Sequence, residues 1–212
     1  NTQPSFLMMG PPGTGKTTIA KCLLEHFNYN VLEFNASDIR AQKNVREKLT
    51  KILNTENLSI LSNKKQTTAI IMDEVDGMIG GDRGGINELI SILCPKRKKG
   101  RKKKDSVSIL PYKNPIICIS NKESEKKILE LKKISQYTTF DYPSVNDLSN
   151  LIIKITNNEN ITIDKTCINC VINHGQKDYR RIIGILQELK RCAKDEFITQ
   201  EIIEKVSNLY NK

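Results

Sequence analysis

A glycine-rich octapeptide near the start of the chain, Gly10-Pro-Pro-Gly-Thr-Gly-Lys-Thr17, places the strongest constraint on the fold. The apolar run 6–9 precedes it, and a helix-forming segment follows to about Phe27. Glycines let the backbone turn tightly, so successive N–H groups converge on an anion at the N-terminus of the next helix. The octapeptide fits G-x-x-x-x-G-K-[ST] at every defined position, which predicts a P-loop between a strand and a helix. The alternative, a glycine-rich turn without a ligand, is disfavoured by the strand before it and the helix after it.

The P-loop predicts ATP and Mg²⁺ as ligands. Lys16 can neutralise the β- and γ-phosphates, and the Thr17 hydroxyl can bind the metal ion. The predicted nucleotide-binding residues are Gly10, Pro11, Pro12, Gly13, Thr14, Gly15, Lys16, Thr17, Thr18 and Asp73.

An acidic motif, Asp73-Glu-Val-Asp76, follows the apolar run 68–72. Ligands of open α/β sheets bind at the carboxyl ends of the strands, which is where this motif stands. We expect Asp73 to hold Mg²⁺, through water, and Glu74 to polarise the attacking water as general base. Asp76 is expected to be a helix-start or structural residue. Acidic residues that merely end a strand are the alternative, and the P-loop upstream argues against it.

Three further residues are candidates on weaker signals. Asn121 closes the apolar segment 115–119, and a neighbouring strand would bring its amide close to the γ-phosphate and the attacking water. Arg180 and Arg181 open a predicted helix near the C-terminus. Each of these three residues also has an ordinary interpretation, as a strand-end amide or a solvated helix charge.

The order of the predicted elements indicates an α/β fold. Continuous apolar strands separated by helices are typical of a parallel sheet covered on both faces. The predicted strands are 6–9, 30–34, 68–72, 115–119 and 138–140, and the helices between them include 44–53 and 86–93.

The pattern changes after Pro143, where helical spacing dominates. Ser144-x-x-Asp147 reads as a capping box that opens the first of four helices. We therefore predict a nucleotide-binding domain with a five-stranded parallel sheet over 1–142 and a small all-helical lid domain over 143–212. The predicted lid helices are 144–157, 164–174, 177–194 and 199–210.

The net charge of +10 is concentrated in one place. The run Lys96–Lys104 contains eight basic residues, and without them the net charge falls to about +2. This run lies in an insertion at about 94–114. A solvated loop, a nuclear-localisation signal and a contact with DNA phosphates all remain open for it.

The cysteine pattern favours a reduced, intracellular protein. Of six scattered cysteines, only Cys167 and Cys170 form a C-x-x-C pair, and they lie in an apolar, helix-like stretch. Buried thiols are therefore expected rather than zinc ligands. No apolar run approaches the roughly 20 residues that span a bilayer, so no membrane partner is expected.

Taken together, these motifs resemble those of AAA+ ATPases. The P-loop with two prolines, the acidic motif, the polar residue after strand four and an arginine in a helical lid all occur in that family. Leu32-Glu-Phe-Asn-Ala-Ser-Asp38 resembles clamp-loader subunits of the replication factor C family, and Asp82-Arg-Gly-Gly-Ile-Asn-Glu-Leu-Ile90 resembles the large subunit in particular. The resemblance covers about residues 5–195.

This resemblance implies a function and further roles. Asn121 corresponds to sensor 1, and Arg180 corresponds to the sensor 2 arginine of the lid. The implied activity is ATP hydrolysis coupled to the loading of a sliding clamp on primer-template DNA. The implied partners are clamp-loader small subunits, the clamp and DNA, and the implied location is the nucleus if the organism is eukaryotic. Because family members have a further helical collar domain, we expect this chain to be an ATPase module or a short version.

One departure from the family pattern is informative. Small clamp-loader subunits carry a Ser-Arg-Cys motif before the fifth strand, and here Gln136 stands where its arginine would be. Glutamine cannot supply the fixed charge of an arginine finger, so this subunit resembles a receiver of a finger. Two alternatives remain. One is the large subunit of a cohesion- or checkpoint-type clamp loader, because the cohesion-linked subunit resembles this chain in having an insertion at about 94–114. The other is a subunit that binds ATP structurally without turnover.

Overall fold

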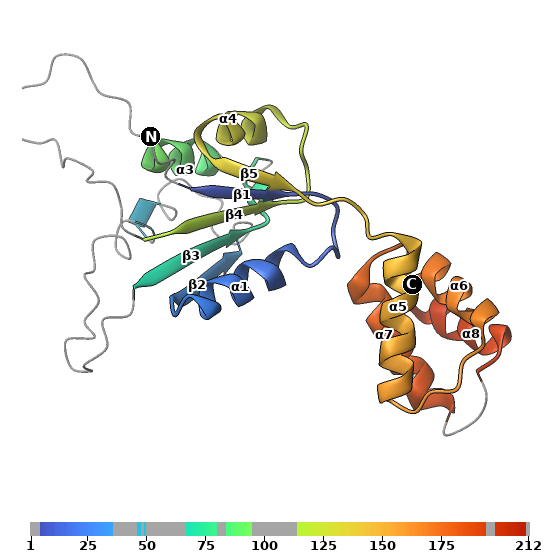
Figure 1. Cartoon of the computed structure of the whole chain (residues 1–212). Coiled ribbons are helices and arrows are strands. Elements are labelled where there is room, and N and C mark those ends of the chain that lie inside the picture. The colour runs from blue at the N-terminus through green and yellow to red at the C-terminus, as the bar shows by residue number, and fades with distance from the viewer. Residues whose placement is uncertain are drawn as a thin grey trace, which may run out of the picture. The chain divides into compact units, whose positions relative to one another are not determined.

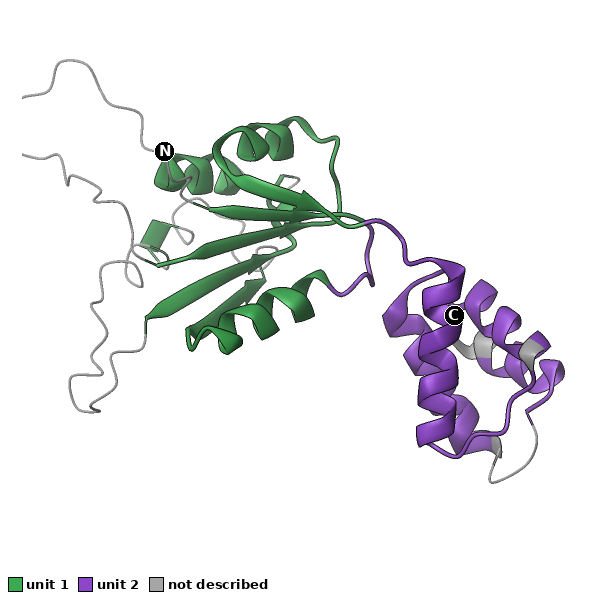
Figure 2. Ribbon diagram, viewed as in Figure 1, with its two compact units in different colours: residues 1–10, 16–140 green, residues 11–15, 141–212 purple. Residues whose placement is uncertain are grey.

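The computed structural model describes residues 5–35, 46–47, 49, 67–79, 84–94, 114–193 and 198–210. The basic run 96–104 and most of the predicted helix 44–53 lie outside these residues. The chain divides into two compact units (Figure 2). The sheet unit comprises Asn1–Gly10 and Lys16–Phe140, and the helical unit comprises Pro11–Gly15 and Asp141–Lys212.

The sheet unit contains five parallel strands in the order β2-β3-β4-β1-β5, which confirms the predicted α/β fold. The first four strands lie close to their predicted positions. The fifth begins two residues earlier than predicted, because Gln136 already pairs with Phe6. The strands are β1 (Phe6–Met9), β2 (Asn30–Asn35), β3 (Thr68–Asp73), β4 (Ile116–Ser120) and β5 (Gln136–Thr139).

Helices cover both faces of the sheet, as a parallel sheet requires. Helix α1 (Lys16–His26) lies against one face, whereas α3 (Gly85–Leu93) and α4 (Lys126–Ile134) lie against the other (Figure 1). Because side chains alternate along a strand, Met8 packs in the core on the α1 side, and Leu7 packs in the other core. Helix α4 was not predicted, because its two buried residues stand among lysines and glutamates.

The helical unit contains α5 (Val145–Asn158), α6 (Lys165–His174), α7 (Tyr179–Ala193) and α8 (Gln200–Tyr210). These four helices confirm the helical pattern predicted after Pro143. The N-cap bond of the predicted capping box is present: Ser144 Oγ accepts a hydrogen bond from the Asp147 N–H at 3.1 Å. A separate core fills this unit, with buried Leu148, Ile185 and Ile203 among its members.

Burial raises the pKa of two cysteine thiols, Cys118 and Cys170. Burial raises the pKa of the Cys118 thiol, on β4, to about 12. Cys167 is buried as predicted, whereas Cys170 is half-buried, and burial is the main cause of its raised pKa. The thiols of Cys118 and Cys170 therefore stay protonated near neutral pH. All six cysteines are free thiols.

Within the described residues, no helix is long and apolar enough to cross a membrane.

Gly10 links β1 to the P-loop in a place that has no room for a side chain. Its φ is +143°, and a Cβ atom there would lie 2.2 Å from the carbonyl oxygen of Phe140. The Phe140 N–H donates to the Met9 carbonyl at 2.7 Å, which fixes this close approach. The end of β5 therefore requires glycine at the first P-loop position.

We expect Gly10→Ala to lower the free energy of unfolding by about 3 kcal/mol or more, because backbone strain and a collision add together. The comparison is Gly15→Ala, where φ is +87° but a Cβ would meet no atom within 4 Å. Backbone strain alone should then cost about 1 kcal/mol. Urea unfolding followed by circular dichroism measures both values, and equal losses would contradict the collision.

Candidate nucleotide-binding site

The predicted site residues of the sheet unit come from three adjacent strands. The P-loop follows β1, Asp73 ends β3, and Asn121 follows β4, which lies between the other two strands. Because all three strands are parallel, their carboxyl ends meet at one edge of the sheet. The fold thus gathers Lys16, Thr17, Asp73, Glu74 and Asn121 at the edge where the sequence predicts them.

The P-loop has the backbone that a phosphate cradle needs. Gly13 and Gly15 have φ values of +71° and +87°, which side-chain-bearing residues rarely adopt. A Cβ on Gly15 would point into open space, so the backbone there is accessible to a ligand. Lys16 is only 5% exposed, and its Nζ donates to the Gly10 carbonyl at 2.9 Å. The ammonium thus lies beside the loop that phosphates would occupy, and the residues present fit a phosphate ligand.

Thr17 and Asp73 lie side by side, as a shared magnesium site requires. The Thr17 hydroxyl donates to Asp73 Oδ2 at 2.6 Å, and the Glu74 N–H donates to Asp73 Oδ1 at 2.8 Å. A hydroxyl and a carboxylate are the hard oxygen ligands that Mg²⁺ prefers. No cluster of three or more metal-binding side chains occurs among the described residues, so phosphate oxygens and water would complete the coordination.

Glu74 has an unusual backbone conformation for a side-chain-bearing residue. Its φ and ψ are 55° and 41°, in the left-handed region, and it is exposed. Glu74 begins the short 3₁₀ helix η3 (Val75–Met78), whose Val75 and Met78 side chains are buried. Strained backbone of this kind is frequent at functional sites, where the surrounding packing holds it in place.

Asp76 has contacts that sequence reasoning did not find. It was expected to be a helix-start or structural residue, and it does lie in the first turn of η3. Its Oδ1 also accepts a hydrogen bond from the Asn121 N–H at 3.1 Å and lies 3.3 Å from Ser120 Oγ. No local pattern could predict this pairing, because Asp76 lies in η3 and Asn121 follows β4, 45 residues further along the chain.

Arg180 belongs to the helical unit, at the start of α7. The Asp178 carboxylate caps this helix by accepting hydrogen bonds from the N–H groups of Arg180 and Arg181. Arg181 also donates through its guanidinium to Gln176 at 2.7 Å. The guanidinium of Arg180 has no hydrogen-bond or ion-pair partner within the described part of the chain, and Arg180 is exposed. Arg180 rather than Arg181 is therefore the available cation.

The P-loop tip contacts the same helix start. The Tyr179 N–H donates to the Gly13 carbonyl at 3.0 Å. A Cβ on Gly13 would lie about 2 Å from the Asp178 carboxylate, so this contact also requires glycine. Asp178 and Tyr179 were not among the predicted site residues, since their contact with Gly13 joins segments far apart in sequence.

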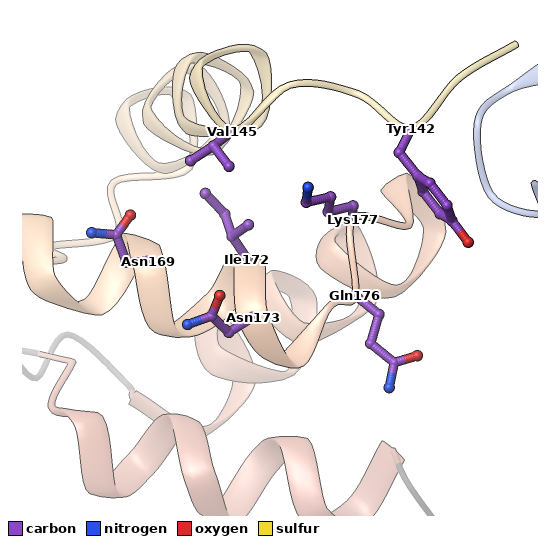
Figure 3. A pocket seen from close by; sticks show the side chains of 7 residues that line it. All are labelled: Tyr142, Val145, Asn169, Ile172, Asn173, Gln176 and Lys177. Atoms are coloured by element: carbon purple, nitrogen blue, oxygen red, sulfur yellow. The ribbon is translucent and has the colours of Figure 1, made fainter.

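The helical unit also has a pocket of about 620 Å³. Figure 3 shows Val145 and Ile172 facing one another, with the Lys177 side chain beside them. Aliphatic side chains, an aromatic ring and side-chain amides together suit a planar, partly polar ligand. The lining residues are Tyr142, Val145, Asn169, Ile172, Asn173, Gln176 and Lys177.

Comparison with known proteins supports the resemblance drawn from the motifs. The chain is 31% identical to replication factor C subunit 1 of Schizosaccharomyces pombe over 199 residues, which cover 90% of this chain and 20% of that protein. It is 31% identical to the human subunit 1 over 92% of this chain and 16% of that protein. Identity to the replication factor C large subunit of Methanococcus vannielii is 32%, over 89% of this chain and 34% of that protein. The chain thus spans only a sixth to a third of these relatives.

A solved structure has a similar fold, and a family model matches the sequence. The RuvB Holliday junction branch migration motor of Thermotoga maritima aligns with a TM-score of 0.65 at 15% identity, over 98% of this chain and 62% of that chain. Residues 6–142 match the ATPase family associated with various cellular activities (AAA). This match covers more than half of the sequence, and the chain therefore belongs to the AAA family of ATPases.

Proposed function

We propose that this chain is the ATP-binding and ATP-hydrolysing module of a sliding-clamp loader, of the large-subunit type. The observation that carries the ATPase part is the 2.6 Å hydrogen bond between Thr17 and Asp73 at the carboxyl edge of the sheet. It joins the P-loop helix to the acidic motif, the pair of groups that a magnesium nucleotide requires. The similarity to replication factor C subunit 1 and to a replication factor C large subunit supports the clamp-loader part.

Binding is assigned to the P-loop and its helix. The Lys16 ammonium exchanges its hydrogen bond to the Gly10 carbonyl for the β- and γ-phosphate oxygens. Backbone N–H groups from Gly13 to Thr17 donate to the phosphates, and Thr18 completes this set. Thr17 and Asp73 hold the metal ion, with Asp73 acting through water. When bound, Mg²⁺ supplies positive charge against the developing charge on the phosphate oxygens.

Chemistry is assigned to three side chains. Glu74 takes a proton from the attacking water as general base. Asn121 orients this water and the γ-phosphate from the end of β4. Arg180, the available cation at the start of α7, stabilises charge on the γ-phosphate. These roles make a subunit that only binds ATP structurally the weaker alternative, since Asp73, Glu74 and Asn121 are all present at the sheet edge.

We assign the nucleotide base to the pocket of the helical unit. Val145 and Ile172 offer apolar faces, and the amides of Asn169 and Asn173 offer hydrogen bonds to ring nitrogens. Lys177, also at the pocket, directly precedes Asp178, which lies against the P-loop tip at Gly13. The pocket and the phosphate-binding loop tip thus belong to the same compact unit.

The wider role follows from the relatives. We propose that ATP holds the module in a state that binds clamp and DNA, and that hydrolysis releases both. Its partners are clamp-loader small subunits, a sliding clamp and primer-template DNA, and its location is the nucleus in a eukaryote. We place the functional domain boundary at 142/143. The relatives named above are two replication factor C subunits 1 and one replication factor C large subunit, so the alternative clamp loaders are not favoured.

The site is proposed to need an arginine from a neighbouring subunit. Gln136 is the first residue of β5 and is exposed, and its backbone N–H donates to the Ser5 carbonyl. A glutamine there offers no fixed charge to a neighbour's ATP. The chain is therefore a receiver of an arginine finger, which suits a subunit at the end of an open arc.

Replacing Glu74 by Gln should leave ATP bound while slowing hydrolysis about 10²–10⁴-fold, because the general base is lost. Lys16→Ala should instead abolish most Mg·ATP binding. Glu130→Gln changes an exposed carboxylate on α4 and should alter neither property. Calorimetry and single-turnover hydrolysis in the assembled complex measure the two effects. Parental hydrolysis in Glu74→Gln would place the general base elsewhere.

The chain by itself should hydrolyse ATP very slowly, and adding the neighbouring small subunit should raise turnover by up to about 10³-fold. The reason is that the missing positive charge comes from the neighbour. Gln136→Arg should not speed this subunit's own site. Steady-state turnover with and without the partner tests this, and fast turnover by a strictly monomeric chain would refute the arrangement.

A further inference from the structure

The peptide group that joins Ser120 to Asn121 is held at both of its ends. Its carbonyl oxygen accepts a hydrogen bond from the Gly10 N–H at 3.3 Å, and its N–H donates to Asp76 Oδ1 at 3.1 Å. A peptide group is planar and rigid, so the two bonds act on one body. The Cα of Asn121 is therefore fixed between the first P-loop glycine and the Asp76 carboxylate.

The Ser120 side chain holds the turn that follows. Ser120 is fully buried, and its Oγ accepts a hydrogen bond from the Lys122 N–H at 3.1 Å. A hydroxyl has one hydrogen to donate, and the Lys122 carbonyl at 2.7 Å is a closer acceptor than Asp76 Oδ1 at 3.3 Å. Hydrogen bonds thus hold the backbone on both sides of Asn121, whereas the residue itself is exposed to solvent.

The position of Asp76 is itself fixed. It lies in η3 between the buried side chains of Val75 and Met78, and the Gly77 N–H donates to the Glu74 carbonyl at 2.8 Å. Asp76 stands two residues after Glu74, so the short helix that holds Glu74 in its left-handed conformation also aims the Asp76 carboxylate. A carboxylate that accepts from a backbone N–H makes a charge-assisted bond, stronger than a neutral one.

We propose that Asp76 is a positioning residue for Asn121. Its carboxylate holds the peptide before Asn121, so that the amide side chain starts from one fixed point at the end of β4. The same contact ties the segment after Glu74 to the strand beside the P-loop. This inference rests on the proposed role of Asn121 in hydrolysis, but the contact itself can be measured without ATP.

The test compares Asp76→Ala, which removes the acceptor, with Asp76→Asn, which keeps a side-chain oxygen of the same shape. Glu130→Ala serves as the matched control. Hydrogen exchange of the Asn121 amide, measured by NMR on the full chain without nucleotide, should become about tenfold faster or more in Asp76→Ala and change little in Asp76→Asn. ATP turnover in the assembled complex should fall about 10–100-fold in Asp76→Ala, with ATP affinity within about twofold.

A double-mutant cycle decides whether Asp76 acts through Asn121. In an Asn121→Ala background, Asp76→Ala should slow hydrolysis little further, because the residue to be positioned is absent. An equal further loss overturns the inference, as does unchanged Asn121 exchange in Asp76→Ala. If Asp76→Ala fails to fold, Asp76→Asn is the deciding variant. Slow ATP turnover in Asp76→Asn, with the Asn121 amide still protected from hydrogen exchange, overturns the inference. Parental hydrolysis in Glu74→Gln overturns the proposed function instead, and hydrogen exchange of the Asn121 amide still reports on the contact between Asp76 and Asn121.

Discussion

The parallel pairing of β3, β4 and β1 is the constraint on which the rest of the structure depends. Strand β4 pairs with β1 on one side and with β3 on the other, although these two strands lie far apart in sequence. Pairing in register brings the P-loop, the acidic motif and Asn121 to one edge. Helices on both faces keep these short strands buried, and buried backbone groups must then be satisfied by one another.

A continuous line of hydrogen bonds crosses that edge. Lys16 donates to the Gly10 carbonyl, Gly10 donates to Ser120, and Asn121 donates to Asp76. A ligand that draws Lys16 away from the Gly10 carbonyl removes one bond from this line. The P-loop and the segment after Glu74 are therefore in contact through β4 as well as through the Thr17–Asp73 bond. The positions of the proposed catalytic groups depend on one another rather than on separate loops.

The positive charges that we assign to ATP hydrolysis differ in where they lie on this chain. Lys16 is buried beside the P-loop, and Arg180 is exposed at the capped start of α7, where Asp178 fixes the backbone. At Gln136 the chain has no positive charge to offer a neighbour. The position of Lys16 at the P-loop agrees with membership of the AAA family. The glutamine at position 136 favours the proposal that turnover depends on an adjoining subunit.

The sequence alone predicted the five strands in their order along the chain and the residue types at the strand ends. Gly10–Thr17 and Asp73–Asp76 were identifiable because each follows an apolar run, and the Ser144 cap because its spacing is local. Only the tertiary structure could show that Asp76 contacts Asn121 and that Gly10 touches Phe140. Helix α4 also escaped prediction, since its apolar residues are few and its identity depends on packing against the sheet. The propensity of a segment for helix or strand depends on neighbouring residues in the sequence, whereas contacts between strands depend on which strands the fold places side by side.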